Sequence, residues 1–242
     1  MPGWLTARPV AHRGLHDASS GAIENNAAAF KAAIAGNYGI ECDIQITADG
    51  EAMVHHDDAL GRLTDGVGAL KTKTAAELKQ VAFKATADRM LTLGELCDLT
   101  AGRVALVIEL KSRFDGDLRL AQRAAKVLTG YKGPAAVMSF DPEPIGALRD
   151  LAPALPRGLV AMQRGASNPA ASGPSAARFV MQALAARLGF LAYRVQDLGT
   201  VIPSTARTVL GLPLLTWTVR TPEDRVRAAR YADQMIFEGF RP

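Results

Sequence analysis

The sequence predicts a (β/α)8 barrel, a TIM barrel, with a small insertion after the second strand. Eight short apolar segments alternate with Ala- and Leu-rich segments along 242 residues, which is the order of elements in such a barrel. An open, doubly wound sheet would show the same alternation, but no Gly-rich dinucleotide motif follows the first strand. We therefore interpret residues 1–242 as a single domain with an excursion at about residues 48–90.

Apolar runs define the strands, and segments rich in Ala and Leu define the helices between them. The predicted strands are Pro9–His12, Ile40–Ile46, Val104–Glu109, Ala136–Phe140, Gly158–Met162, Phe190–Arg194, Leu214–Val219 and Gln234–Phe237. The predicted helices are Asn25–Ala35, Leu93–Leu99, Gly116–Leu128, Pro142–Leu151, Ala176–Leu188, Pro203–Val209 and Pro222–Tyr231. Three of these begin with proline, which the first turn of a helix accepts.

The excursion begins with a hairpin. Asp49-Gly50 is a strong turn signal, so the chain should return antiparallel over Ala52–His56, with one helix at Thr74–Val81. A two-residue loop would place Ala48 opposite Glu51. That register puts His56 opposite Asp43 and His55 opposite Ile44, with the His55 side chain on the other face.

The overall composition excludes some functional classes. Net charge is +4 with a pI near 9.2, but Lys and Arg are scattered, which argues against a nucleic-acid partner. Cys42 and Cys97 form no disulfide framework, so we expect a reducing, cytoplasmic setting. The N-terminus lacks a secretory signal pattern, and no apolar run approaches the ~18 residues of a transmembrane segment.

Acid–base and metal-binding groups lie at the ends of the first three predicted barrel strands. Glu41 and Asp43 share one face of a strand, and Ile40, Ile44 and Ile46 share the other. The outer face of a barrel strand is covered by helices and should be apolar, so the carboxylates should point inward. With Glu109 they offer the three carboxylates of a Mg²⁺ or Ca²⁺ site. The alternative for Glu109 is a local salt bridge with Lys111.

Histidine and arginine complete this set of groups. All four histidines precede Asp57, and His12 and His56 lie beside the carboxylates, where they suit a general acid and a general base. Arg13 can hold a phosphate in a bidentate contact, or it can pair with Glu24. Together these groups suit metal-assisted cleavage of a small phosphodiester.

The sequence leaves the roles of Asn25, Phe140 and Trp217 undecided between structure and function. Glu24 is assigned to the site, while Asn25 suits a helix N-cap as well as a site role. Phe140 and Trp217 lie at strand ends, where they either pack the core or form the wall of a substrate pocket.

In combination these motifs resemble the glycerophosphodiester phosphodiesterase family, from His12 to about Val219. The motifs that carry the resemblance are His12-Arg13-Gly14, Glu24-Asn25, Ala29-Phe30, Glu41-x-Asp43, Asp49-Gly50, His56-Asp57, Leu60-x-Arg62-x-Thr64, Leu93-x-x-Leu96, Ile108-Glu109-x-Lys111, Ser139-Phe140 and Trp217-Thr218-Val219. The family implies a TIM barrel that hydrolyses glycerophosphodiesters to sn-glycerol 3-phosphate and an alcohol with one Mg²⁺ or Ca²⁺ ion.

Carried over by motif, the resemblance implies a role for each site residue. It implies His12 and His56 as the acid–base pair, and attack by a glycerol hydroxyl that gives a cyclic phosphate. The metal ligands would be Glu41, Asp43 and Glu109. The residues that contact the substrate or its phosphate would be Arg13, Lys111, Glu24, Phe140 and Trp217.

The chain departs from the family at Asn26, where Thr is usual, and at Glu238, where many members have Asp before the final Pro. Two other functions remain open. A lysophospholipase D-type enzyme would need an apolar trough near Phe140, Trp217 and residues 163–174, and a non-catalytic phosphate-binding barrel would not need the histidines.

Overall fold

The computed structural model describes residues 2–163 and 176–242. The strands are β1 Val10–Ala11, β2 Gly39–Ile46, β3 Ala52–Val54, β4 Leu106–Leu110, β5 Ala135–Ser139, β6 Arg157–Ala161, β7 Phe190–Arg194, β8 Leu214–Val219 and β9 Gln234–Phe237. The helices are α1 Trp4–Ala7, α2 Ala27–Ala35, α3 Ala75–Gln80, α4 Leu93–Thr100, α5 Arg119–Gly130, α6 Pro142–Leu151, α7 Ala176–Ala186, α8 Val201–Thr208 and α9 Pro222–Tyr231. Single 3₁₀ turns lie at η1 Ala18–Ser20, η2 Leu70–Thr72 and η4 Val195–Asp197.

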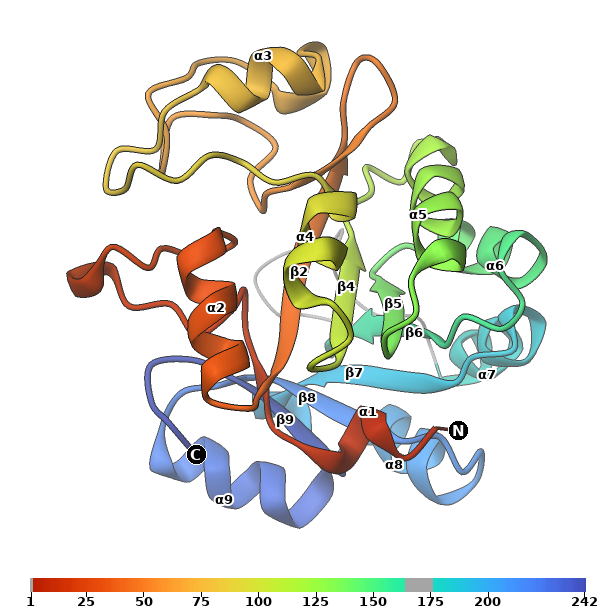
Figure 1. Ribbon diagram of the computed structural model, residues 1–242. Helices are drawn as coiled ribbons and strands as arrows, with labels where there is room; N and C mark the ends of the chain where they lie inside the picture. The colour runs from red at the N-terminus through yellow and green to blue at the C-terminus, as the bar shows by residue number, and fades with distance from the viewer. Residues whose placement is uncertain (1, 164–175) are drawn as a thin grey trace.

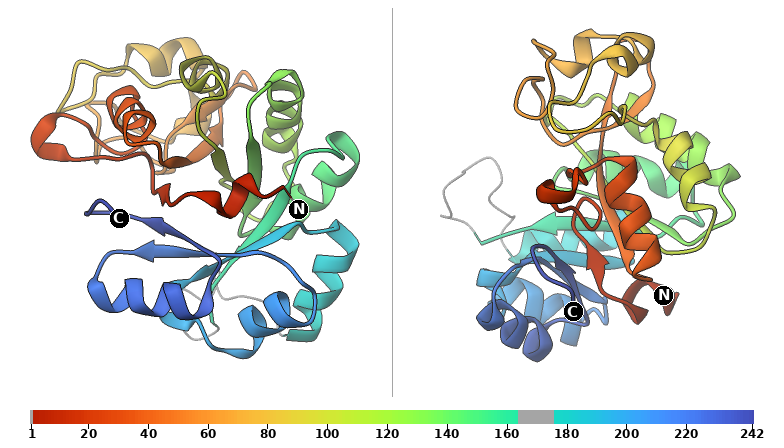
Figure 2. Two further views of the ribbon diagram at one scale, coloured as in Figure 1. Left: turned by 60° about the horizontal axis from the view of Figure 1, so that its bottom comes forward. Right: turned by 60° about the vertical axis from the view of Figure 1, so that its left-hand side comes forward.

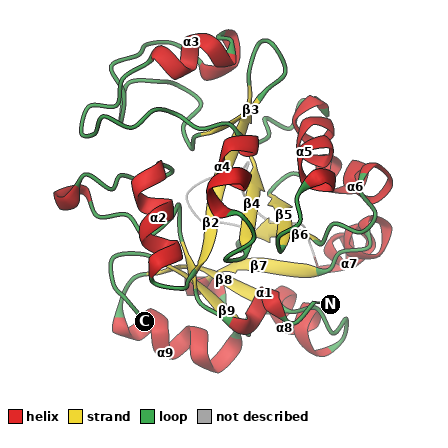
Figure 3. Cartoon of the chain, viewed as in Figure 1, coloured by secondary structure: helices red, strands yellow, loops and turns green. Residues whose placement is uncertain are grey.

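The strands form a closed barrel with helices around its outside (Figures 1 and 2). The sheet runs β1-β9-β8-β7-β6-β5-β4-β2-β3, and a further pairing of β1 with β2 closes the ring. All pairings within the ring are parallel. Figure 3 shows the strands enclosed by the helices. The predicted (β/α)8 barrel is confirmed, and its closure excludes the open doubly wound sheet.

Alternate residues of each strand pack on opposite sides of the barrel wall. Ile40, Cys42, Ile44 and Ile46 of β2 belong to the large outer core between the strands and the helices. A smaller inner core fills the barrel, with Val10, Val107, Ala136, Met138, Val160, Phe190, Ala192, Leu215 and Ile236 among its members. Leu5 of α1 also belongs to this inner core. This alternation directs the odd-numbered polar residues of β2 toward the barrel interior, as predicted.

Side-chain caps explain several helix starts. Thr221 and Asp224 form a capping box at α9, and Asp141 caps α6, with proline in the first turn of both helices. Several predicted helix starts were wrong. Helix α5 begins at Arg119 rather than Gly116. Helix α8 begins at Val201 rather than Pro203, and the N-cap of α2 is Asn26, whose side chain accepts from the Ala29 amide.

The hairpin after β2 exists, but its predicted register was wrong by one residue. Ile46 pairs with Ala52 and Ile44 with Val54, so the His55 amide, rather than His56, donates to the Asp43 carbonyl at 3.0 Å. The loop contains three residues because the Thr47 amide bonds to the Glu51 carbonyl, and Gly50 adopts a φ of +80°. A left-handed glycine is typical of three-residue hairpin loops. Strand β3 then ends at Val54 instead of His56.

The rest of the excursion lies beyond the end of β2, with α3 at the top of Figure 1. It has a small apolar core of its own that includes Met53, Leu70 and Leu78. In the described ranges, no helix is both long and apolar enough to cross a membrane. The predicted trough at 163–174 lies outside the described residues, except for Gln163.

Candidate active site

Three buried carboxylates meet at the carboxyl ends of β2 and β4. Glu41 and Asp43 are each 1% exposed and Glu109 is 8% exposed. Asp43 and Glu109 are direct neighbours across the two parallel strands. One oxygen from each of the three carboxylates lies within 4.8 Å of the others. This arrangement of hard oxygen donors is suitable for a Mg²⁺ or Ca²⁺ ion.

Lys111 lies against two of these carboxylates. Its Nζ is 2.8 Å from Asp43 Oδ1 and 2.7 Å from Glu109 Oε1. Burial disfavours the charged form of Asp43, but Lys111 and Arg13 outweigh it and lower the pKa of Asp43. Burial and the neighbouring Asp43 and Glu109 carboxylates raise the pKa of Glu41 well above its usual value. Glu41 is therefore the carboxylate of the cluster that holds its negative charge least readily.

His12 and Arg13 follow β1 in a tight turn. Arg13 and Gly14 have φ values of 56° and 81°. A Cβ at Gly14 would lie 2.9 Å from the Ala29 Cβ of α2, so the turn can pass this helix only at glycine. The turn directs the Arg13 amide to Glu41 Oε2 at 2.9 Å and leaves His12 Nε2 4.0 Å from the same oxygen.

The Arg13 guanidinium contacts carboxylates on both sides. Its Nη1 donates to Glu24 Oε1 at 2.8 Å, and its Nε lies 3.3 Å from Asp43 Oδ2. The pairing with Glu24 that the sequence left open is therefore present. Arg13 is 18% exposed at the side chain, so it joins the carboxylate cluster to the rim of the barrel.

Glu24 also pairs with Arg62 of the excursion, through Nη1 at 3.0 Å and Nη2 at 2.6 Å. Arg62 Nε in turn donates to Asp57 Oδ2 at 2.5 Å, and His56 Nδ1 is 2.8 Å from Asp57 Oδ1. Burial acts to raise the pKa of Asp57, but the hydrogen bonds from Arg62 and His56 lower it to about 2. This chain of ion pairs connects the predicted acid–base residue His56 to the barrel rim.

His55 and His56 lie in different surroundings. His55 is 2% exposed, whereas the His56 side chain is 32% exposed. Because the chain leaves β3 at Val54, strand alternation no longer determines where these two rings point. The predicted reason for separating the histidines was wrong, while their separate environments remain.

The sequence reasoning did not identify Gln45 and left two alternatives for Asn25. Asn25, with a φ of 57°, donates from its amide nitrogen to Asp43 Oδ2 at 2.9 Å, so it supports the cluster and does not cap α2. Gln45 donates from Nε2 to the carbonyls of His55, His56 and Asp57, at 3.3, 3.0 and 2.6 Å. Gln45 has the same parity on β2 as Glu41 and Asp43, which is a signal that could have identified it.

Phe140 and Trp217 form an apolar wall at the same end of the barrel. Their rings meet edge to face at a centroid distance of 5.5 Å, and both pack on the inner core. The Trp217 Nε1 is buried and has no hydrogen-bond partner among residues 2–163 and 176–242. Both predicted residues therefore pack against the inner core at the carboxyl end of the barrel strands.

The profile of the glycerophosphoryl diester phosphodiesterase family matches residues 12–239. The chain belongs to this family. The resemblance noted in the sequence motifs is thereby confirmed over nearly the whole length.

Several relatives of this family resemble the chain. A glycerophosphodiester phosphodiesterase of Caldanaerobacter subterraneus is 34% identical over 161 residues, which cover 62% of this chain and 65% of the relative. The chain spans slightly less than two thirds of the length of the curated relatives it matches first.

Two solved structures share the fold over most of both chains. An Oleispira antarctica phosphodiesterase in complex with the product sn-glycerol-3-phosphate has a TM-score of 0.79 at 22% identity, with 95% of this chain and 91% of that chain covered. A Thermotoga maritima glycerophosphodiester phosphodiesterase has a TM-score of 0.74 at 24% identity, with 95% and 94% covered.

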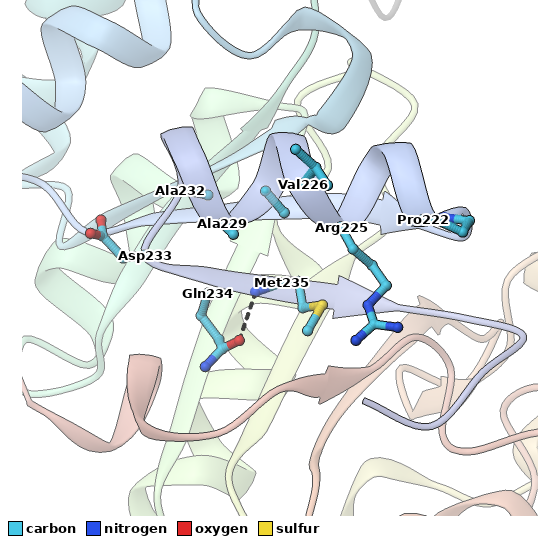
Figure 4. Close-up of a pocket in the computed structure, with 9 residues that line it drawn as sticks. Pro222, Arg225, Val226, Ala229, Ala232, Asp233, Gln234 and Met235 are labelled. Atoms are coloured by element: carbon cyan, nitrogen blue, oxygen red, sulfur yellow. Dashed lines mark hydrogen bonds between the residues drawn. The ribbon is translucent and has the colours of Figure 1, made fainter.

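A separate surface pocket lies between α9 and β9, lined in part by Arg225, Val226, Gln234 and Met235 (Figure 4). None of the predicted site residues lines it. The carboxylates Glu41, Asp43 and Glu109 lie instead at the carboxyl ends of β2 and β4, where barrel enzymes hold their reacting groups. We therefore place the candidate active site of this family member at the carboxylate cluster.

Proposed function

We propose that the protein hydrolyses glycerophosphodiesters to sn-glycerol 3-phosphate and an alcohol. The observation that carries this proposal is the cluster of Glu41, Asp43 and Glu109 in a chain that belongs to the family. His12 lies 4.0 Å from Glu41, and His56 is joined to the barrel rim through Asp57, Arg62 and Glu24. A solved relative with the same fold is a phosphodiesterase in complex with the product sn-glycerol-3-phosphate, which supports the substrate class.

We propose Glu41, Asp43 and Glu109 as ligands of one divalent ion, Mg²⁺ or Ca²⁺. Bound there, the ion would neutralise charge on the phosphoryl oxygens and orient the attacking hydroxyl. Lys111 and Arg13 supply the remaining positive charge. Both are already within 3.3 Å of Asp43, so a phosphate at the cluster would be within reach of an ammonium and a guanidinium.

The histidines move the protons in this proposal. One of His12 and His56 accepts the proton of the glycerol hydroxyl next to the phosphate, and that oxygen forms a bond to phosphorus. The other donates a proton to the alcohol oxygen as its bond to phosphorus breaks, which leaves a cyclic phosphate. Water then opens the ring with the two histidine roles exchanged, giving sn-glycerol 3-phosphate and restoring both protonation states.

Phe140 and Trp217 would cover the carbon skeleton of the glycerol group. The same apolar wall favours one alternative, a lysophospholipase D-type activity, in which an acyl chain extends along these rings. Because Cys42 and Cys97 are both buried free thiols, we also propose a cytoplasmic location, where thiols stay reduced.

The decisive experiment is to assay the purified protein with glycerophosphocholine, glycerophosphoethanolamine and a lysophospholipid, each with Mg²⁺, Ca²⁺ or a chelator. The proposal expects release of sn-glycerol 3-phosphate from the first two, loss of turnover with chelator, and a transient cyclic phosphate visible by ³¹P NMR. Preferential cleavage of the lysophospholipid would favour the alternative. Full turnover after exhaustive metal removal would contradict the metal assignment, and no turnover with any substrate and metal would contradict the activity.

A further inference from the structure

Glu238 lies beside His12 although the two residues are 226 positions apart in the sequence. Strands β1 and β9 are parallel neighbours, with Ala11 paired to Phe237. Each strand is followed directly by one of the two residues, so their side chains meet at the same end of the barrel. The distance from His12 Nδ1 to Glu238 Oε2 is 2.7 Å.

This contact determines which nitrogen of His12 carries the proton. An ionised carboxylate only accepts hydrogen bonds, so Nδ1 must donate. In neutral His12 the other nitrogen, Nε2, is then unprotonated. It is the nitrogen on the carboxylate side, 4.0 Å from Glu41 Oε2. The hydrogen bond to Glu238 therefore leaves His12 Nε2 as a proton acceptor that faces the carboxylate cluster.

Arg220 holds the carboxylate in this position. Its Nη2 donates to the same Oε2 at 2.8 Å, so two donors converge on one oxygen. The hydrogen bond from His12 outweighs burial and lowers the pKa of Glu238 to about 2, which keeps the acceptor charged near neutral pH. Glu238 Oε2 thus has two fixed partners, and His12 Nδ1 has a permanent acceptor.

A cation site is the competing explanation, because His12, His16 and Glu238 offer three ligand atoms within 4.8 Å of one another. The contacts favour the hydrogen-bonded arrangement. Oε2 already accepts from two donors, and the guanidinium of Arg220 would repel a cation at the same oxygen. His16 Nε2 is 3.9 Å from the other oxygen, Oε1, beyond hydrogen-bond distance.

We propose that Glu238 is a positioning residue that fixes His12 as the Nδ1–H tautomer, with Nε2 directed at the reacting groups. The consequence for turnover rests on the proposed phosphodiesterase function, whereas the tautomer itself does not. The carboxylate touches no reacting atom, so its removal should lower kcat and leave KM nearly unchanged.

The first test is ¹⁵N NMR of the histidine-labelled protein at a pH where His12 is neutral. The expected result in the wild type is one His12 tautomer with the proton on Nδ1. A wild-type His12 protonated on Nε2 would overturn the proposal without any variant. Because this measurement needs no substrate, it separates failure of the positioning from failure of the proposed activity.

The second test compares Glu238→Ala with Glu238→Gln. The Ala variant should populate both tautomers and lose about 10- to 100-fold in kcat, as for removal of the partner of a functional histidine. The Gln variant should keep the Nδ1–H tautomer and most of kcat, because Arg220 can only donate and so keeps the amide oxygen turned toward His12. Wild-type kcat and an unchanged tautomer in Glu238→Ala would refute the proposal.

Glu223→Ala is the matched control. It removes a fully exposed carboxylate from the first turn of α9, and Glu223 makes no ion pair among the described residues. In this variant the His12 tautomer, kcat and the melting temperature should match those of the wild type. If Glu238→Ala lowers the melting temperature but keeps the tautomer and kcat, Glu238 has a structural role and the positioning proposal is wrong.

Discussion

Glu41 is the residue at which metal binding can be tested most directly. In the absence of metal its buried carboxylate is surrounded by Asp43 and Glu109 and has a raised pKa. Glu41→Gln preserves the shape of the side chain, and its amide oxygen can still accept from the Arg13 amide. The substitution therefore removes one ligand charge and leaves the turn after β1 intact. We expect the metal-free variant to be at least as stable as the metal-free wild type.

The expected effect of the metal follows from binding linkage. At a metal concentration about 100-fold above Kd, binding stabilises the wild type by about 2.7 kcal/mol. For a chain of 242 residues, this corresponds to a rise in melting temperature of about 5 to 11 °C. If loss of the carboxylate weakens binding by about 100-fold, the same metal concentration stabilises the variant by only about 0.4 kcal/mol. The variant should then shift by about 1 °C.

The assay is a thermal-unfolding series in chelator, Mg²⁺ and Ca²⁺. Asp98→Asn is a suitable control because it removes an exposed carboxylate from α4, and it should retain the full metal-dependent shift. A Glu41→Gln variant that is stabilised by metal as strongly as the wild type would refute the ligand assignment. A wild type whose melting temperature does not respond to either ion would refute the metal site.

Three further predictions concern groups around the cluster. Arg13→Lys should lower kcat/KM by an amount that corresponds to a loss of roughly one to three kcal/mol in transition-state binding, because an ammonium cannot hold two phosphate oxygens. Unchanged kinetics would make Arg13 a structural residue. His56→Ala should lower the turnover rate by ~10²-fold or more, while the buried His55→Ala should mainly lower the melting temperature; the reverse pattern would contradict the assignment. The lowered pKa of Asp57 contributes stability that is present above pH 3.8 and lost as the pH falls through about 2. Arg62→Met should move the pKa of Asp57 back toward its ordinary value, so the unfolding free energy of the variant should depend less on pH between about 2 and 4 than that of the wild type. A dependence in urea titrations as steep as that of the wild type would count against the ion pair.

Much of the fold could be predicted because its strands and caps are local signals. The bounds of β7, β8 and β9 agree with the apolar runs residue for residue, as do α6 and α9, whose first turns contain Pro142 and Pro222. The inward direction of Glu41 and Asp43 followed from the parity of the isoleucines on β2. These features depend on neighbouring residues alone, so the sequence contains the information needed to find them.

The features that were missed depend on contacts that neighbouring residues do not reveal. Thr47 accepts the Glu51 amide at its hydroxyl and extends the hairpin loop to three residues, which a search for Asp-Gly does not detect. Asn25 reaches Asp43 only because its backbone is left-handed. Glu238 contacts His12 through closure of the barrel, and no short-range pattern joins the two ends of the chain.

The position of Glu24 between Arg13 of the barrel and Arg62 of the excursion has a consequence for engineering. The segment that carries His56 is electrostatically matched to this particular barrel. In a chimera, a donor segment from another family member that lacks an arginine at position 62 would leave Glu24 with Arg13 but without its partner in the excursion. Exchange of this segment to alter substrate choice should therefore succeed only when Glu24, Asp57 and Arg62 are transferred as a set.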